Sequence, residues 1–81
     1  MPPEVTLYTR KGCHLCETAK ENLLRARRQA NFDLHEIDID GDPDLLALYN
    51  EEVPVITING KKAFKYHVDE QSFLKKLKDR L

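Results

Sequence analysis

The dipeptide Asn59-Gly60 constrains the fold of this chain more than any other short stretch of its sequence. Asn-Gly is the strongest short signal for a tight turn between antiparallel strands, because both positions accept a positive φ angle. The stretch "VPVITI" precedes the dipeptide and "KKAFKY" follows it, and both have the composition of strands. We therefore expect an antiparallel hairpin over residues 53–66.

The first half of the chain predicts a strand, a helix and a second strand. "EVTLYT" (4–9) is rich in β-branched and aromatic residues, which is typical of a strand. After it, small and apolar side chains recur at spacings of three and four, as on the buried face of a helix. These positions are Cys16, Ala19, Leu23, Ala26 and Ala30. "FDLHEIDID" (32–40) then alternates and predicts a strand that carries His35, Ile37 and Ile39 on one face, with His35 partly buried.

Two more helices are predicted from their starting residues. In "DGDPDLLALYN", Asp42 is an expected N-cap and Pro43 occupies the first helical position, where its missing N–H costs nothing. Asp69 is the expected N-cap of a last helix. The apolar stripe of that last helix consists of Phe73, Leu74, Leu77 and Leu81.

The resulting order is β-α-β-α-β-β-α, and it predicts an α/β fold. A strand-helix-strand opening implies parallel pairing, whereas the hairpin pairs the last two strands antiparallel. We therefore expect a mixed four-stranded sheet with helices packed on it. No repeat or Pro/Gly/Ser-rich linker divides the 81 residues, so a single domain over 1–81 is predicted.

The charge balance excludes several classes of protein. Charged residues make up 33% of the chain, but the net charge is only -1, so no broad field attracts nucleic acid or an acidic membrane surface. No apolar stretch has the length of a signal peptide or a transmembrane span. We expect a cytoplasmic protein that binds neither nucleic acid nor membrane.

Cys13 and Cys16 are the two cysteines of the chain, and they stand in a C-x-x-C pattern. In a reducing compartment this spacing indicates redox or metal chemistry rather than a structural disulfide. A closed zinc site needs four ligands, whereas the pair supplies two and the three histidines are scattered. Inert packing of both thiols is the third interpretation, and it is disfavoured by Gly12 and by the loop-to-helix junction.

The position of the pair assigns a different role to each cysteine. Cys13 precedes the predicted helix, whose unpaired N–H groups and dipole stabilise a thiolate and lower the pKa of that thiol. Arg10, Lys11 and protonated His14 add positive potential. Cys16 lies one helical turn later and is the first residue of the predicted buried stripe. Cys13 is therefore the expected nucleophile and Cys16 the expected resolving thiol.

The motifs "GCHLC" and "EVPVITING", in this order of elements, resemble the glutaredoxin-like proteins of the thioredoxin superfamily. The resemblance implies a thiol-disulfide oxidoreductase that uses a redox-active disulfide and no other cofactor. It also implies that the Val53-Pro54 bond is cis and faces the cysteine pair, so that the backbone of Val53 binds an extended substrate. Lys11 and His14 complete the expected substrate-binding residues.

The chain departs from glutathione-binding glutaredoxins in one segment. Those proteins carry a Gly-Gly pair after the fourth strand, whereas "AFKYHVDE" places Phe64 and Lys65 there, with Asp69 slightly late. The segment therefore favours a protein disulfide as substrate. The reductant is expected to be a thioredoxin-reductase-like protein or glutathione.

Two other functions remain open for the same fold. One is a carrier of a metal ion or of an iron–sulfur cluster, which would need ligands from outside this chain. The other is a redox-inactive module that binds peptides beside Val53 and Pro54. For the oxidoreductase we expect a monomer.

Overall fold

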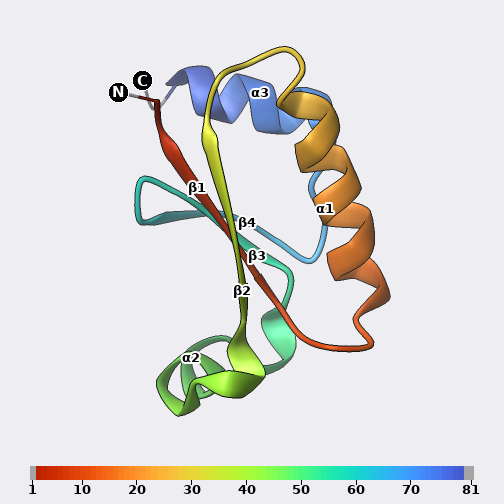
Figure 1. The fold of residues 1–81 in the computed structure, drawn as a ribbon, viewed down its shortest axis with the longest axis vertical. Coiled ribbons are helices and arrows are strands. Elements are labelled where there is room, and N and C mark those ends of the chain that lie inside the picture. Colours follow the sequence, from red (N-terminus) through yellow and green to blue (C-terminus); the bar gives the residue numbers. More distant parts are fainter. Residues whose placement is uncertain (1, 80–81) are drawn as a thin grey trace.

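The helices and strands follow the predicted order (Figure 1). The computed structural model describes residues 2–79, so Leu81, expected on the last helix, lies outside the described residues. Within residues 2–79, no helix is long and apolar enough to cross a membrane. The elements are β1 (Glu4–Thr9), α1 (His14–Ala26), β2 (Asp33–Asp38), the 3₁₀ segment η1 (Ile39–Gly41), α2 (Pro43–Tyr49), the 3₁₀ segment η2 (Asn50–Glu52), β3 (Val55–Ile58), β4 (Lys61–Lys65) and α3 (Glu70–Asp79).

The four strands form one mixed sheet in the order β2-β1-β3-β4. β1 pairs parallel with β2, whereas β3 pairs antiparallel with both β1 and β4. Asn59 and Gly60 have φ angles of 51° and 84°, which are the positive values that the tight turn between β3 and β4 requires. The predicted α/β architecture with a mixed four-stranded sheet is therefore confirmed.

Most of the apolar side chains lie between the sheet and the helices α1 and α3. Figure 1 shows these two helices next to each other, while α2 lies at the far end of the sheet. The rings of Phe32 and Phe73 meet edge to face, with their centroids 5.2 Å apart. We call this group the main core, and its buried residues are Val5, Leu7, Ala19, Leu23, Ala26, Phe32, Ile56, Ile58, Val68, Phe73 and Leu77.

Side-chain caps begin the second and third α-helices where the sequence predicted them. The carboxylate of Asp42 accepts hydrogen bonds from the N–H groups of Asp44 and Leu45, at 2.9 and 3.3 Å. Asp69 accepts one from the N–H of Ser72 at 2.8 Å. Each cap satisfies N–H groups that have no partner within the helix.

The strand β2 corrects one expectation. His35 is exposed rather than partly buried, and its Nε2 lies 3.9 Å from Oε1 of Glu4. Ile37 is also exposed, while Ile39 lies beyond the end of β2, in η1, and is buried. Leu34, on the other face of β2, packs against the main core. Alternation identified the strand, but it did not reveal that α1 and α3 cover only the face that Leu34 shares.

Candidate active site

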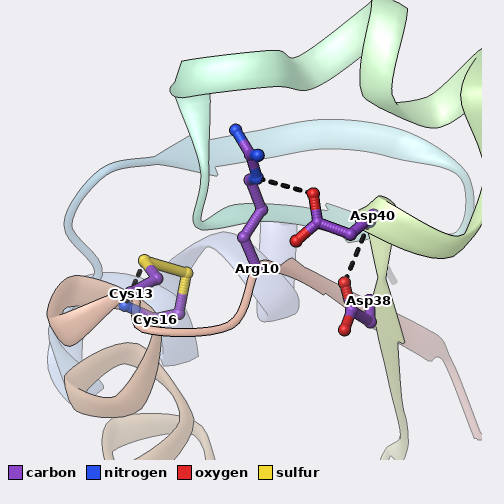
Figure 2. A network of polar contacts seen from close by, with 5 residues as sticks. All are labelled: Arg10, Cys13, Cys16, Asp38 and Asp40. Carbon is purple, nitrogen blue, oxygen red and sulfur yellow. Dashed lines mark hydrogen bonds and ion pairs between the residues drawn. A yellow bond between two sulfur atoms is a disulfide. The ribbon is translucent and has the colours of Figure 1, made fainter.

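Cys13 and Cys16 lie at the start of α1 and are joined by a disulfide (Figure 2). Cys13 is the N-cap residue of the helix, with extended backbone angles, and the Cα atoms of the two cysteines are 5.2 Å apart. The N–H of Cys16 donates a hydrogen bond to Sγ of Cys13 at 3.1 Å. Sγ of Cys13 therefore occupies the position in which a helix N-terminus stabilises negative charge.

The two cysteines differ in exposure, as the proposed division of roles requires. Cys13 is half-buried, whereas Cys16 is only 3% exposed. Cys16 belongs to a second apolar group, which we call the disulfide cluster. Its buried residues are Cys16, Ile39, Tyr49, Val53 and Val55, and the half-buried Tyr8, Cys13, Leu45 and Leu46 pack against them.

Arg10 is paired with Asp40 rather than free beside Cys13. Its Nε lies 2.9 Å from Oδ1 of Asp40, and the N–H of Asp40 donates to Oδ1 of Asp38 at 2.9 Å. Figure 2 shows the guanidinium turned toward Asp40. This ion pair reduces the positive potential that Arg10 was expected to supply, and it joins the loop before α1 to the segment after β2.

The other expected cations are open to solvent. Lys11 is exposed, and the side chain of His14 is 100% exposed, with Nδ1 3.8 Å from Oε2 of Glu17. Both residues flank Cys13 in the chain, but neither belongs to the disulfide cluster. Their expected contribution is therefore limited to a solvent-screened potential at the rim of the site.

Val53 lies in the disulfide cluster with the cysteines, and Pro54 follows it in the chain. The peptide bond between them is cis, and both side chains are buried, with Val53 in the disulfide cluster. The sheet pairing of β3 begins at Val55, so the backbone of Val53 stands outside the hydrogen-bonded ladder. The carbonyl of Pro54 accepts a hydrogen bond from the N–H of Tyr66 at 2.8 Å. The structure thus brings Cys13, Cys16 and Val53 into one cluster.

Two aromatic residues pack in the disulfide cluster with the cysteines, Tyr8, which the sequence offers as a residue of the substrate groove, and Tyr49, which it does not. The rings of Tyr8 and Tyr49 lie 4.7 Å apart, centroid to centroid. Burial, and then the neighbouring Tyr49, raise the pKa of the Tyr8 phenol above its ordinary value, while a hydrogen bond with Thr57 partly opposes the shift. Tyr8 therefore stays neutral at physiological pH and is not a base for the thiols.

A charged group also lies just before Val53. Nζ of Lys62 and Nζ of Lys65 each lie 3.5 Å from Oε1 of Glu52. The two ammonium groups hold the pKa of the Glu52 carboxyl below its usual value. Lys65, which the sequence placed where glutathione-binding relatives have glycine, is thus paired with an acidic side chain of this chain.

Among residues 2–79, no group of three or more His, Cys, Asp or Glu side chains is arranged to hold a metal ion. Cys13 and Cys16 are bonded to each other. The geometry is that of a thiol pair at disulfide distance at the start of α1, which suits redox chemistry.

Comparison with known families agrees with this geometry. The Glutaredoxin-like domain (DUF836) matches residues 4–78. The chain belongs to this glutaredoxin-like family. A protein of Mycobacterium tuberculosis is 34% identical over 73 residues, which cover 84% of this chain and 75% of that protein. A glutaredoxin-like protein of Dictyostelium discoideum is 35% identical over 72 residues, covering 82% of this chain and 67% of that protein.

Solved structures show that this glutaredoxin-like chain shares the fold of thioredoxins. An X-ray structure of a protein from X. campestris has a TM-score of 0.79 at 31% identity, and the match covers 93% of this chain and 96% of that one. A protein of Nitrosomonas europaea gives 0.79 at 35% identity, over 90% and 88% of the two chains. Chloroplastic thioredoxin z shares the fold, with a TM-score of 0.80 at 15% identity over 96% and 77% of the two chains.

Proposed function

We propose that this protein is a cytoplasmic thiol-disulfide oxidoreductase that reduces protein disulfides through Cys13 and Cys16. The observation that carries the proposal is the position of Cys13 at the N-cap of α1, where its sulfur accepts the N–H of Cys16 at 3.1 Å. A thiolate at this position is stabilised by the helix terminus, so the pKa of Cys13 in the reduced protein lies below that of a free cysteine.

The reaction then takes two exchange steps. The Cys13 thiolate attacks one sulfur of the substrate disulfide; a mixed disulfide forms, and the other substrate sulfur leaves as a thiolate that takes a proton from water. Cys16, after losing its own proton to solvent, attacks Sγ of Cys13. The mixed disulfide breaks, and the second substrate sulfur leaves. Two electrons have passed to the substrate, and the chain holds the Cys13–Cys16 disulfide.

The substrate and the reductant are inferred from the surroundings of the pair. The backbone of Val53 stands outside the sheet ladder beside Cys16, which suits an extended polypeptide. Phe64 packs toward Phe73 and Lys65 pairs with Glu52, so neither leaves the open backbone that a Gly-Gly pair gives glutathione. We propose that a thioredoxin-reductase-like protein, rather than glutathione, returns the pair to the dithiol form. The reaction needs one chain and no bound cofactor.

The decisive experiment traps the intermediate. The Cys16→Ser protein is mixed with a disulfide-containing protein such as native insulin, and we expect a covalent adduct through Cys13 that survives without reductant. The Cys13→Ser protein is the matched control and should form no adduct above background. Adducts are resolved by non-reducing electrophoresis and mass spectrometry. Equal trapping by the two variants would contradict the assigned roles.

The same assay compares the two reducing systems with the unchanged protein. Insulin reduction is measured with thioredoxin reductase and NADPH, and separately with glutathione, glutathione reductase and NADPH. We expect clear turnover in the first system and slow turnover in the second. Faster turnover with glutathione would overturn the assignment of the reductant while leaving the roles of Cys13 and Cys16 intact.

A further inference from the structure

Glu52 lies directly before Val53, and its carboxylate stands between two lysines of β4. Oε1 of Glu52 is 3.5 Å from Nζ of Lys62 and 3.5 Å from Nζ of Lys65. Because the two ammonium groups lower the pKa of the carboxyl, Glu52 is ionised at neutral pH. One carboxylate therefore joins the segment before Val53 to two positions on an edge strand of the sheet.

A shift in the sheet register brings the two lysines together. Side chains three positions apart on a regular strand point to opposite faces. Here the pairing of β3 and β4 is irregular between Ile56 and Thr57. Thr57 is opposite Lys62, and Val55 is opposite Lys65. Since opposed residues of antiparallel strands share a face, both lysines lie on the face of Val55, which belongs to the disulfide cluster.

Aromatic rings hold the two ammonium groups in place beside the carboxylate. Nζ of Lys62 lies 5.6 Å from the ring centroid of Tyr49, which is buried in the disulfide cluster. Nζ of Lys65 lies 5.5 Å from the ring centroid of Tyr66. An ammonium group over the face of an aromatic ring is attracted by the ring electrons. Each lysine is therefore partly ordered by its ring and loses less conformational entropy when it pairs with Glu52.

The backbone of Val53 depends on its two neighbours for its position. It stands outside the sheet ladder, which begins at Val55. After it, the carbonyl of Pro54 accepts a hydrogen bond from the N–H of Tyr66, at 2.8 Å. Before it, the ion pairs of Glu52 make the corresponding attachment. Val53 is thus held between two points that are fixed to β4 or to the residue that follows β4.

We propose that Glu52 is a positioning residue, whose ion pairs with the two lysines orient the backbone of Val53 for an extended substrate. The inference rests on the proposed function, because Glu52 acts through the backbone that binds the polypeptide. Exposed ion pairs contribute little to the stability of a fold, and these side chains are 38–51% exposed. The pairs therefore affect the rate with polypeptide substrates and not the intrinsic reactivity of Cys13.

The test compares two uncharged disulfides that share one leaving group. One is a short peptide of serine, threonine and asparagine, blocked at both ends, whose single cysteine forms a mixed disulfide with thiopyridine. The other is the mixed disulfide of mercaptoethanol with thiopyridine, which has no peptide backbone. The Cys13 thiolate bonds to the sulfur of the cysteine or of mercaptoethanol, and thiopyridine leaves and takes a proton to give thiopyridone.

The absorbance of thiopyridone gives the second-order rate constant for each disulfide with the reduced protein. We call the ratio of the two constants the peptide advantage. For the unchanged protein we expect a peptide advantage of about tenfold, because a bound backbone places the disulfide beside Cys13. The Cys13→Ser protein gives the background.

Two variants test the ion pairs, and a third is the control. Glu52→Gln removes the charge and keeps the size of the side chain, so we expect the peptide advantage to fall by about three- to fivefold. The mercaptoethanol disulfide should react as before. Lys65→Met should lower the advantage by about twofold, because Lys62 still pairs with Glu52. Glu51→Gln changes the exposed carboxylate next in the chain and should keep the full advantage.

Two further measurements show whether the charges act as pairs. The double variant Glu52→Gln/Lys65→Met should have the same advantage as Glu52→Gln alone, because both changes remove one interaction. Added salt should lower the advantage of the unchanged protein and not that of Glu52→Gln, since salt screens the ion pairs while both disulfides are uncharged. Effects that multiply in the double variant, or an advantage that salt leaves unchanged, would overturn the inference.

The outcomes separate this inference from the proposed function. If neither disulfide reacts through Cys13, the proposed function fails, and the role of Glu52 fails with it. If the unchanged protein shows no peptide advantage, the role of Glu52 is overturned while the thiol chemistry stands. If Glu52→Gln keeps the full advantage, or slows both disulfides equally, only the positioning role is overturned.

Discussion

The main core and the disulfide cluster are formed by different segments of the chain and contain different side chains. The main core is closed by α1 and α3 and holds Phe32 and Phe73, both almost fully buried. The disulfide cluster is built largely from α2, its flanking segments and the start of β3. Its buried Tyr49 faces an exposed lysine, since Nζ of Lys62 lies 5.6 Å from the ring centroid.

Because the two groups differ in this way, we expect the main core to determine the stability of the fold and the disulfide cluster to affect the reactivity of the cysteines. A densely packed apolar group resists changes of volume, so damage to the main core lowers the free energy of unfolding. We expect the disulfide cluster instead to limit how far water reaches Cys16, and thereby how readily the reduced thiol reacts. Variants in the main core should therefore mainly lower the free energy of unfolding. Variants in the disulfide cluster should mainly change the reactivity of the thiols.

The largest expected effect comes from Phe73→Ala in the main core. The substitution leaves a cavity below α3, so we expect the free energy of unfolding to fall by about 3–5 kcal/mol. Urea denaturation measures the loss. In the fraction that remains folded, the alkylation rate of Cys13 should be unchanged.

Because such a loss is a large part of the stability of a small domain, Phe73→Leu provides a milder test. This variant should lose less stability and remain fully folded at neutral pH. A change in the alkylation rate of either cysteine in Phe73→Leu would show that the two regions are coupled.

An intermediate effect is expected from Tyr49→Ala in the disulfide cluster. The free energy of unfolding should fall by about 1–3 kcal/mol, less than for Phe73→Ala, because Tyr49 is 9% exposed whereas Phe73 is fully buried. Water then reaches Cys16, so the reduced protein should be alkylated faster at Cys16. Iodoacetamide labelling with mass spectrometry measures the rate, and Tyr49→Phe is the matched control. An unchanged rate at Cys16 in Tyr49→Ala would remove the proposed role of the cluster.

The smallest expected effect comes from Asp40→Asn. The substitution removes a negative charge near the site and leaves Arg10 unpaired, so the pKa of Cys13 should fall, by about half a pH unit or less. A titration of thiolate absorbance at low and high salt measures the shift, which salt should diminish. Glu36→Gln breaks the exposed Lys20–Glu36 pair, farther along α1, and should leave the pKa of Cys13 unchanged. A rise of that pKa in Asp40→Asn would contradict the account of Arg10.

The sequence predicted those features that depend on local patterns. The turn at Asn59, the caps at Asp42 and Asp69, and the place of Cys13 before α1 each follow from a few neighbouring residues. The order of the elements was then enough to predict a mixed four-stranded sheet. The roles assigned to Lys11 and His14, and the binding of substrate by Val53 and Pro54, remain predictions.

The features that escaped prediction depend on contacts between distant segments. Arg10 meets Asp40 because β1 and β2 pair in parallel with Thr9 opposite Asp38, a register that no local pattern reveals. The exposure of His35 depends on which face of the sheet the helices cover. Tyr66 has no sequence signal at all, since positive φ angles are expected at glycine or asparagine and not at an aromatic residue.

Hydrogen bonds hold the connection between β4 and α3 at two points, which makes the residues between them suitable for redesign. The N–H of Tyr66 is held by Pro54 at one end, and the carbonyl of Val68 is held by Asn22 at the other. Between these anchors the side chains of Tyr66 and His67 are exposed. Residues can therefore be exchanged at these two positions as in a small antibody loop, so that a library there would vary an exposed surface while the cysteines and the sheet stay unchanged.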